Sequence, residues 1–202
     1  GSIGHLAAFS FHETKNIISG EGGMLVINDE KLIHRAEIIW EKGTNRASFF
    51  RGEVNKYGWV DTGSSFLPSE IISAFLWAQL ENLEKIQAKR KLLWKTYYNN
   101  LSKKTNPNFS LPEIPDYATN NGHMFYLTFD NIENRTAVIS KLKEHNILSV
   151  FHYLSLHKSE FYKDKHDGRI LDNSDKFTDC LLRLPLYYEL EIEQVNLITD
   201  LI

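Results

Sequence analysis

The sequence predicts an α/β protein made of the end of one α/β domain, a long bridging helix and a small α+β domain. Two observations support this prediction. Short strand-like runs alternate with helical periodicities on both sides of a central stretch. That central stretch, residues 69–103, keeps one helical pattern throughout. We therefore expect three parts: residues 1–68, the C-terminal part of a large domain; 69–103, the interdomain helix; and 104–202, a small C-terminal domain.

The composition narrows the class of protein. Of 202 residues, 42% are hydrophobic and 24% are charged, which is typical of a globular chain and excludes intrinsic disorder. The net charge of −3 favours neither nucleic acid nor an anionic membrane as a partner. Cys180 is the single cysteine, so an internal disulfide is excluded. No apolar run approaches the roughly 20 residues needed to span a bilayer, and no secretory signal is visible. We expect a cytoplasmic protein.

The start of the chain is unusual. It has no initiator methionine and leads almost directly into a strand-like run. We expect the chain to be a fragment, cut inside a domain.

The first part contains two strands and a helix. Leu6–Phe11 is predicted to be a short buried strand, and Met24–Ile27 a second one after the turn Gly20–Gly23. A helix is expected from Glu30 to Lys42, since its apolar residues form one stripe. Residues 43–68 are rich in Gly, Asn, Ser and aromatics without a period, a length more typical of a binding segment than of an inert connection.

The central stretch is the strongest helical signal. No Gly or Pro interrupts residues 69–103. If continuous, the helix would be on the order of 50 Å long, enough to leave one core and enter another. Its apolar residues are spaced three, four or seven apart and are Ile72, Leu76, Leu80, Leu83, Ile86, Leu93, Tyr97 and Leu101.

The last part predicts a small mixed domain. After a loop over 104–122, we expect strand Met124–Phe129, helix Arg135–His145 and strand Leu148–Tyr153. Two further helices are expected, one around Ser174–Leu182 and one from Glu191 to the end.

The most specific motif is Phe9-Ser10-Phe11-His12-Glu13-Thr14-Lys15-Asn16, followed by Gly20-Glu21-Gly22-Gly23. A lysine at a strand end is usually a solvated charge. Here it lies between a strand and a glycine turn, where its side chain can point into a cleft. A cleft can lower the pKa of an amine and allow it to form an imine with an aldehyde.

This motif resembles the cofactor-lysine segment of the DegT/DnrJ/EryC1/StrS sugar aminotransferases, which use pyridoxal 5′-phosphate (PLP). The family pattern is Ser-Phe-His-x-x-Lys-Asn and then Glu-Gly-Gly. The resemblance implies that Lys15 binds PLP as an imine and later moves protons, and that Ser10 donates a hydrogen bond to the cofactor phosphate. It also implies a PLP-dependent transferase of fold type I (aspartate aminotransferase-like), of which this chain is the C-terminal portion. Because the family's other cofactor residues lie upstream of that portion, we expect the chain by itself to be inactive.

Residues 43–65 look like the segment with which this family crosses to the second subunit of a homodimer. In that segment a polar residue before the long helix reaches the partner's cofactor phosphate, and Ser65 occupies the matching position. The Gly-Thr-Asn-Arg and Gly-Ser-Ser sequences look most like dTDP-4-oxo-6-deoxy-D-glucose transaminases (dTDP-4-amino-4,6-dideoxygalactose transaminases). The resemblance therefore implies two shared active sites per dimer.

Two arginines in this segment are candidate ligands of a nucleotide diphosphate. The guanidinium groups of Arg46 and Arg51 can donate paired hydrogen bonds to phosphate. They could equally be structural partners of Asp61 or Glu53, and the sequence leaves both roles open.

A third motif runs from Phe151 to His157. The family usually shows His-Tyr-x-Pro-Leu-His here, so the resemblance implies that His152 and His157 contact the amino donor's carboxylate or the sugar. Ser155 replaces the usual proline. Two ordinary loop histidines are the alternative. We expect no metal, because no third ligand lies nearby in the sequence.

The reaction implied by the resemblance is amino transfer from L-glutamate to the C4 keto group of a dTDP-4-keto-6-deoxyhexose. The product would serve cell-surface polysaccharide, such as O-antigen or enterobacterial common antigen. Neither nucleic acid nor membrane is expected as a partner. One alternative is a dehydratase on the same fold that uses the pyridoxamine form, in which histidine typically replaces the lysine. The other is a non-catalytic dimerisation or binding fragment.

Overall fold

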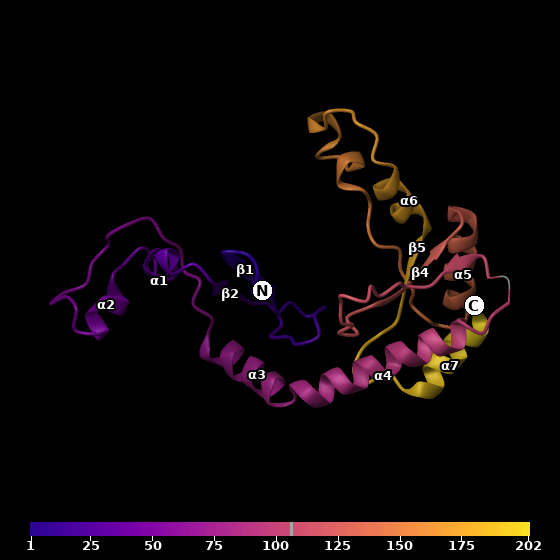
Figure 1. Cartoon of the computed structure of the whole chain (residues 1–202), viewed down its shortest axis with the longest axis horizontal. Coiled ribbons are helices and arrows are strands. Elements are labelled where there is room, and N and C mark those ends of the chain that lie inside the picture. Colours follow the sequence, from indigo (N-terminus) through magenta and orange to yellow (C-terminus); the bar gives the residue numbers. More distant parts are fainter. Residues whose placement is uncertain (106) are drawn as a thin grey trace. The chain divides into compact units, whose positions relative to one another are not determined.

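The computed structural model describes residues 1–105 and 107–202. They form two compact units, residues 1–83 and 84–202 (Figure 1). The boundary between the units falls inside the predicted interdomain helix, 69–103.

The first unit begins with an antiparallel strand pair, β1 (Leu6–Ser10) and β2 (Gly23–Ile27). Both strands were predicted from the sequence, but the burial expected for the first is wrong in this chain. Phe9 is 45% exposed, and Met24 and Leu25 on the facing strand are 46% and 53% exposed. The reason is that this sheet has only two strands among the described residues, so no further layer covers its apolar side chains.

The helix predicted over 30–42 forms in two pieces. A 3₁₀ turn, η1 (Glu30–Leu32), leads into α1 (Ile33–Trp40). Asp29 starts the turn, since its carboxylate accepts a hydrogen bond from the backbone N–H of Lys31 at 3.0 Å. A short helix that the sequence did not predict, α2 (Arg46–Phe50), lies in the segment that follows.

The prediction of one continuous helix over 69–103 is wrong. Two helices form, α3 (Glu70–Glu81) and α4 (Leu83–Leu101). They are separated at Asn82, whose backbone leaves the helical conformation (φ −101°, ψ 11°). Its side-chain N–H donates to the carbonyl of Ala78 at 2.9 Å. An asparagine side chain competes in this way with the backbone hydrogen bonds of a helix. The break could not be predicted from the apolar periodicity, because that periodicity continues across it.

The second unit contains a three-stranded antiparallel sheet in the order β3 (Phe109–Ser110), β4 (Phe125–Phe129), β5 (Leu181–Leu184). Of these, only β4 was predicted as a strand. The predicted strand over 148–153 is wrong, because its pairing is limited to a single bridge at Val150. The apolar side chains on either side of that bridge are mostly exposed, so burial does not extend the pairing.

Three helices complete this unit: α5 (Ile132–Glu144), α6 (Asp172–Cys180) and α7 (Ile192–Leu201). All three were predicted, with ends shifted by a few residues. Between β4 and α6 the chain also forms two 3₁₀ turns, η2 (Leu156–Lys158) and η3 (Lys163–Lys165).

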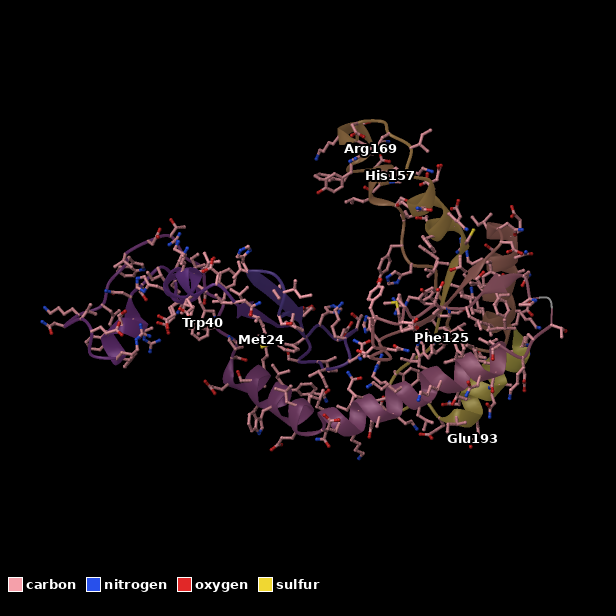
Figure 2. All side chains as sticks on the ribbon, viewed as in Figure 1. Met24, Trp40, Phe125, His157, Arg169 and Glu193 are labelled. Atoms are coloured by element: carbon pink, nitrogen blue, oxygen red, sulfur yellow. The ribbon has the colours of Figure 1, made fainter. Side chains whose placement is uncertain are left out.

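The core of the second unit forms around β4, whose side chains alternate between the core and the opposite face of the sheet. Phe125, labelled in Figure 2, is fully buried and its ring stacks on Tyr97 of α4, with centroids 5.0 Å apart. Burial raises the pKa of the Tyr97 phenol, whose hydroxyl donates to the carbonyl of Pro185 at 2.9 Å. The other buried core residues are Leu93, Trp94, Leu101, Phe109, Leu127, Phe129, Leu142, Leu182, Leu184, Leu190, Val195 and Ile198.

Arg90 on α4 is buried in this unit and is 6% exposed. Its Nε donates to the carbonyl of Gly122 at 3.0 Å, and one Nη donates to the carbonyls of His123 and Leu186 at 2.7 and 3.2 Å. Burial lowers the pKa of this guanidinium. Gly122 has a φ of +61°, and a Cβ there would lie 3.0 Å from the Arg90 backbone, so the loop can approach the helix only without a side chain. Arg90 thus fastens two loops to α4.

Within residues 1–105 and 107–202, no helix combines the length and the apolar character that a membrane crossing requires.

We predict that Arg90→Met lowers the free energy of unfolding of this unit by about 2–4 kcal/mol, because three backbone carbonyls lose a charged donor inside the fold. Urea unfolding monitored by circular dichroism measures the change. Lys91→Met is the matched control, since Lys91 is the exposed neighbour of Arg90 on α4, and we expect it to change stability by less than about 0.5 kcal/mol. Equal effects of the two substitutions would show that the buried hydrogen bonds do not stabilise the unit.

Candidate active site

The loop that carries Lys15 is closed by backbone hydrogen bonds directly beyond the β1–β2 pair. The N–H of Phe11 donates to the carbonyl of Gly22 at 2.9 Å, and the N–H of Glu13 donates to the carbonyl of Gly20 at 3.0 Å. The loop is therefore an extension of the strand pair, and Lys15 has a fixed place in it.

The side chain of His12 organises the turn before Lys15. Its Nδ1 lies 3.2 Å from the backbone N–H of Thr14 and 3.0 Å from the hydroxyl of the same residue, both of which are donors. Its Nε2 lies 3.6 Å from a carboxylate oxygen of Glu21. The N–H of Lys15 then donates to the His12 carbonyl at 2.9 Å. His12 and Glu21, both part of the sequence motif, thus join the two sides of the loop.

Gly22 explains why the motif carries a glycine at this position. Its φ is +155°, and a Cβ there would lie 2.6 Å from Oγ of Ser19. Ser19 is 7% exposed, and its hydroxyl donates to the carbonyl of Glu21 at 2.8 Å. A larger residue would push against a buried, hydrogen-bonded side chain, so the close packing of the loop requires glycine here.

Lys15 and Ser10 offer groups that fit the two ends of PLP. Lys15 is half-buried, and within residues 1–83 no carboxylate lies within ion-pair distance of its ammonium. Ser10 is exposed, and its Oγ accepts a hydrogen bond from the His12 N–H at 3.3 Å. That contact does not use the hydroxyl hydrogen, which can therefore be donated to a phosphate. One closed loop thus carries both an amine that can react with the aldehyde of PLP and a hydroxyl that can bind its phosphate.

In the segment before α3, two stretches of the chain pass very close to each other at Gly43 and Gly63. A Cβ on Gly43 (φ +78°) would collide with the carbonyl of Asp61, and one on Gly63 would collide with the backbone of Gly43. This close approach leads directly to Ser65, which is exposed and pairs with Glu41 through an isolated β-bridge. The backbone around Ser65 is thereby held, while its hydroxyl is accessible.

The sequence left two roles open for Arg51, a ligand of a diphosphate or a structural partner of an acidic residue. Its contacts in the structure are those of a structural partner. Its guanidinium donates to both carboxylate oxygens of Glu37 at 2.9 and 3.1 Å, and to those of Glu53 at 2.7 and 3.2 Å. The hydrogen bonds to Glu53 and then Glu37 raise the pKa of Arg51, and Arg51 in turn lowers the pKa of Glu53. These bonds join α1 to the end of α2.

Arg46 is exposed and has a different environment. Its guanidinium lies 5.0 Å from the ring centroid of Phe50, over the ring face. Asp61, one of its possible partners, forms an ion pair with Arg35 instead. Arg46 therefore keeps its charge accessible for a ligand.

In the second unit, His152 contacts Arg183 of β5, to which the sequence analysis assigned no role. An Nη of Arg183 lies 2.8 Å from Nδ1 of His152. The imidazole also packs on the ring of Tyr153, with centroids 4.1 Å apart. The ring of His152 is thus held on two sides.

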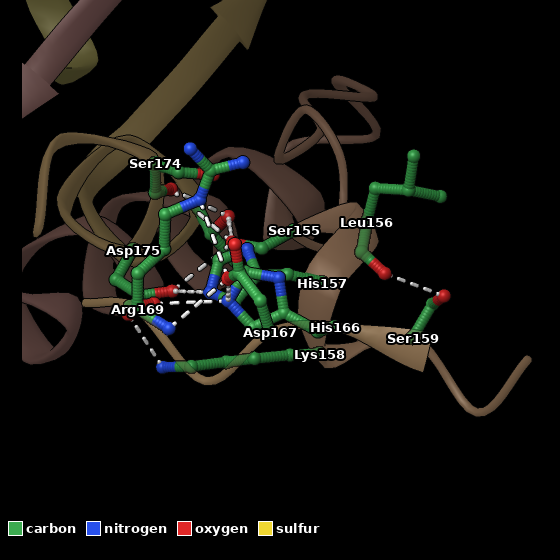
Figure 3. Close-up of polar contacts among 11 residues, drawn as sticks. Ser155, Leu156, His157, Lys158, Ser159, His166, Asp167, Arg169, Ser174 and Asp175 are labelled. Atoms are coloured by element: carbon green, nitrogen blue, oxygen red, sulfur yellow. Dashed lines mark hydrogen bonds and ion pairs between the residues drawn. The ribbon is translucent and has the colours of Figure 1, made fainter. Parts of the chain in front are cut away.

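His157 is held by Asp175 in the first turn of α6 (Figure 3). Its Nε2 lies 3.1 Å from Oδ1 of Asp175, and Nζ of Lys158 lies 2.8 Å from Oδ2. Ser155, which replaces the usual proline, donates to Asp175 at 3.2 Å and shares a hydrogen bond of 2.7 Å with Thr178. The hydrogen bond from Lys158 is the largest cause of the lowered pKa of Asp175. The sequence analysis missed Asp175, whose only signal was an acidic residue near a helix start.

His157 also lines a hollow of about 300 Å³ in the loop between η2 and α6, a size near the lower limit of ligand pockets. The ring centroids of His157 and His166 lie 5.1 Å apart. Figure 2 labels His157 and Arg169 on this loop. Nε2 of His166 lies 2.9 Å from the carbonyl of Arg169. In the part of the chain that the structure describes, no group of three His, Cys, Asp or Glu side chains is arranged to hold a metal ion.

The structure therefore places the predicted site residues in two groups. Lys15, Ser10, Ser65 and Arg46 lie in residues 1–83, and His152 and His157 lie in residues 84–202. Within the first group, Lys15 and Ser10 belong to one loop. In the second, both histidines belong to the segment between the Val150 bridge and η2.

Known proteins resemble this chain over its whole length. It is 27% identical over 205 residues to the spore coat polysaccharide biosynthesis protein SpsC of Bacillus subtilis, covering 97% of this chain and 52% of that protein. It is 26% identical to the UDP-4-amino-4,6-dideoxy-N-acetyl-beta-L-altrosamine transaminase of Helicobacter pylori, covering 97% and 51%. Among solved structures, S. venezuelae DesV in complex with a ketimine intermediate superposes with a TM-score of 0.83 at 26% identity, covering 98% and 51%.

The chain spans about half the length of the curated relatives it matches. A model of the DegT/DnrJ/EryC1/StrS aminotransferase family matches residues 1–202. The matches confirm the expected fold type I and the expected aminotransferase family, with PLP as the cofactor of that family. The chain belongs to the DegT/DnrJ/EryC1/StrS aminotransferase family.

Proposed function

We propose that the complete protein containing this chain transfers an amino group from L-glutamate to the C4 keto group of a dTDP-linked 4-keto-6-deoxyhexose. The observation that carries this proposal is the closed loop that presents Lys15, with Ser10 at its start. The names of two relatives support amino transfer to a nucleotide sugar in general: one protein belongs to polysaccharide biosynthesis, and the other is a transaminase of a UDP-linked amino sugar. The product would enter a cell-surface polysaccharide such as O-antigen or enterobacterial common antigen.

Lys15 is the residue proposed to do the acid–base work. PLP, when bound, supplies an aldehyde that the amine can capture and a ring that withdraws electrons. Once displaced by a substrate amine, the Lys15 amino group accepts and returns a proton at the substrate carbon, as a general base and then a general acid. Ser10 donates its hydroxyl hydrogen to the cofactor phosphate. The hydrogen bond from the His12 N–H to Oγ orients the hydroxyl for this.

Candidate substrate ligands are proposed in each unit by itself. Arg46 pairs with the nucleotide diphosphate, since its guanidinium has no competing carboxylate among the described residues. Arg51 is not proposed to bind the substrate directly, because its guanidinium already donates hydrogen bonds to Glu37 and Glu53. His152 and His157 contact the sugar or the amino donor. Ser65 donates to the cofactor phosphate of a second subunit, so the protein is proposed to be a homodimer with shared sites.

Asp175 is proposed to be the positioning residue for His157. Its two carboxylate oxygens accept from different groups, His157 and Ser155 on one side and Lys158 on the other. A carboxylate behind an imidazole fixes the orientation of the ring and thereby aims its other nitrogen. The loop that usually depends on proline is here stabilised by polar contacts to α6.

The dehydratase alternative is disfavoured by residue 15 itself. A lysine there can carry a proton and also hold the cofactor, whereas the dehydratases typically have histidine. No feature of the described residues favours dehydration over amino transfer.

We predict that Lys15→Ala abolishes the PLP adduct that borohydride reduction traps on the complete protein, and abolishes amino-sugar formation from L-glutamate. The measurements are the mass of the reduced protein and product detection with dTDP-4-keto-6-deoxyglucose and, in parallel, with a UDP-linked 4-keto sugar. Lys31→Ala is the control, because Lys31 is an exposed lysine of the same unit, and it should retain both properties. A trapped adduct in Lys15→Ala would contradict the assignment of the lysine. Product from the UDP sugar alone would contradict the proposed nucleotide.

We also predict that the loop from Ser155 to Asp175 loosens in acid. The folded pKa of Asp175 is lowered, so its contribution is fully present above its ordinary pKa of 3.8 and is lost as the pH falls through the folded value. Limited pepsin cleavage of this loop should therefore increase below pH 3.8, and Asp175→Asn should be cleaved faster than wild type above that pH. Asp167→Asn, on the same loop but exposed, is the control. Identical pepsin cleavage of wild type and Asp175→Asn at about pH 4.5, where pepsin is still active and the Asp175 contribution is present, would contradict the role of Asp175.

A further inference from the structure

Arg183 lies on the face of the sheet opposite the core of the second unit. Its neighbours on β5, Leu182 and Leu184, are 0% and 4% exposed and point into that core. Since strand side chains alternate, Arg183 points to the other face. Tyr126 of β4 is its partner across the sheet on one side, and Val150 is its partner on the other.

The pairing with Val150 explains why Arg183 meets His152. The N–H of Arg183 donates to the carbonyl of Val150 at 2.8 Å, and the N–H of Val150 donates back at 3.2 Å. His152 follows Val150 by two residues, so in an extended segment it lies on the same face and diagonally opposite Arg183. The observed 2.8 Å between Nη of Arg183 and Nδ1 of His152 is this diagonal contact.

The chemistry of arginine decides the protonation of the imidazole. A guanidinium has five N–H donors and no acceptor, and it remains charged in proteins. At 2.8 Å it can only donate to Nδ1, which must then present its lone pair. The single ring proton of His152 is therefore on Nε2. A doubly protonated ring would place two N–H groups and two positive charges against each other.

Tyr153 stacks on the imidazole and brings no charge. Arg135 of α5 contacts the preceding residue instead, and its guanidinium lies 5.7 Å from the ring centroid of Phe151.

We propose that Arg183 is a positioning residue that holds His152 as the neutral Nε2–H tautomer, so that His152 is a hydrogen-bond donor to a sugar oxygen. This proposal rests on the proposed function, and it chooses between the two ligands considered for His152. A carboxylate is bound most strongly by a cationic donor, whereas a neutral N–H suits the hydroxyl or carbonyl oxygen of the nucleotide sugar. His152 acts in this assignment neither as a cation nor as a proton acceptor.

The direct test is ¹⁵N NMR of histidine-labelled complete protein at pH 7. The expected result is a His152 imidazole protonated on Nε2 only. In Arg183→Met, we expect the ring to become a mixture of tautomers. A charged or Nδ1-protonated His152 in the wild type at pH 7 would overturn the proposal. This readout does not require any enzymatic activity.

Kinetics separate positioning from mere structural support. In Arg183→Met, the KM for the keto sugar should rise about tenfold and acquire a new dependence on pH, while the half-reaction with L-glutamate keeps its KM. Arg183→Lys, which keeps a charged donor, should partly restore the sugar KM. Arg135→Gln is the matched control, because it removes another arginine that donates to a backbone carbonyl (of Asp179) in the same unit.

The outcomes are distinguishable from failure of the proposed function. If the wild type transfers no amino group but shows the Nε2–H tautomer, the reaction is wrong and the pairing of Arg183 with His152 stands. If Arg183→Met and Arg135→Gln lower the melting temperature equally and change both half-reactions alike, Arg183 is structural and the proposal is overturned.

Discussion

The close approach of Gly22 to the buried side chain of Ser19 is the constraint on which the placement of Lys15 depends. Ser19 donates to the Glu21 carbonyl, and the space left for Gly22 has no room for a Cβ. This packing allows the loop to close with the hydrogen bond from the N–H of Phe11 to the carbonyl of Gly22. Lys15 is presented by a short loop closed by hydrogen bonds, and its proposed role toward cofactor and substrate requires such a fixed position.

The histidine segment of the second unit solves a related problem with polar contacts. The usual proline is replaced by Ser155, so the backbone loses a source of stiffness. The hydroxyl of Ser155 is buried and bonds to α6 through Asp175 and Thr178, which restores the constraint. At the other end of the segment, Arg183 and the bridge at Val150 hold His152. Each histidine therefore has a charged residue that fixes its ring, and neither of these residues lies near it in the sequence.

Much of the local structure could be predicted from the sequence, for physical reasons that also explain the failures. The strands β1, β2 and β4 and the helices of the second unit follow from apolar periodicity and from turn residues. The break at Asn82 could not, because it depends on one side chain that bonds to the Ala78 carbonyl within a pattern that remains periodic. The isolated bridge at Val150 and the short strands β3 and β5 depend on partners distant in the chain. The motif around Lys15 could be recognised in the sequence because its residues are consecutive, whereas Asp175 and Arg183 contact the histidines across 18 and 31 residues.

The central claim is that the geometry of this loop, and not merely the presence of a lysine, makes Lys15 able to bind PLP. Gly22→Ala tests it most directly in the complete protein, because it leaves Lys15 and Ser10 unchanged and introduces a Cβ against Ser19 at a positive φ. Gly52→Ala is the matched control, since Gly52 also has a positive φ (+75°) but has no atom within 4 Å of the added Cβ. The measurement is the amount of PLP trapped by borohydride as the PLP concentration is varied. The account predicts a clear loss of affinity in Gly22→Ala and near wild-type trapping in Gly52→Ala. Wild-type trapping in Gly22→Ala would contradict it.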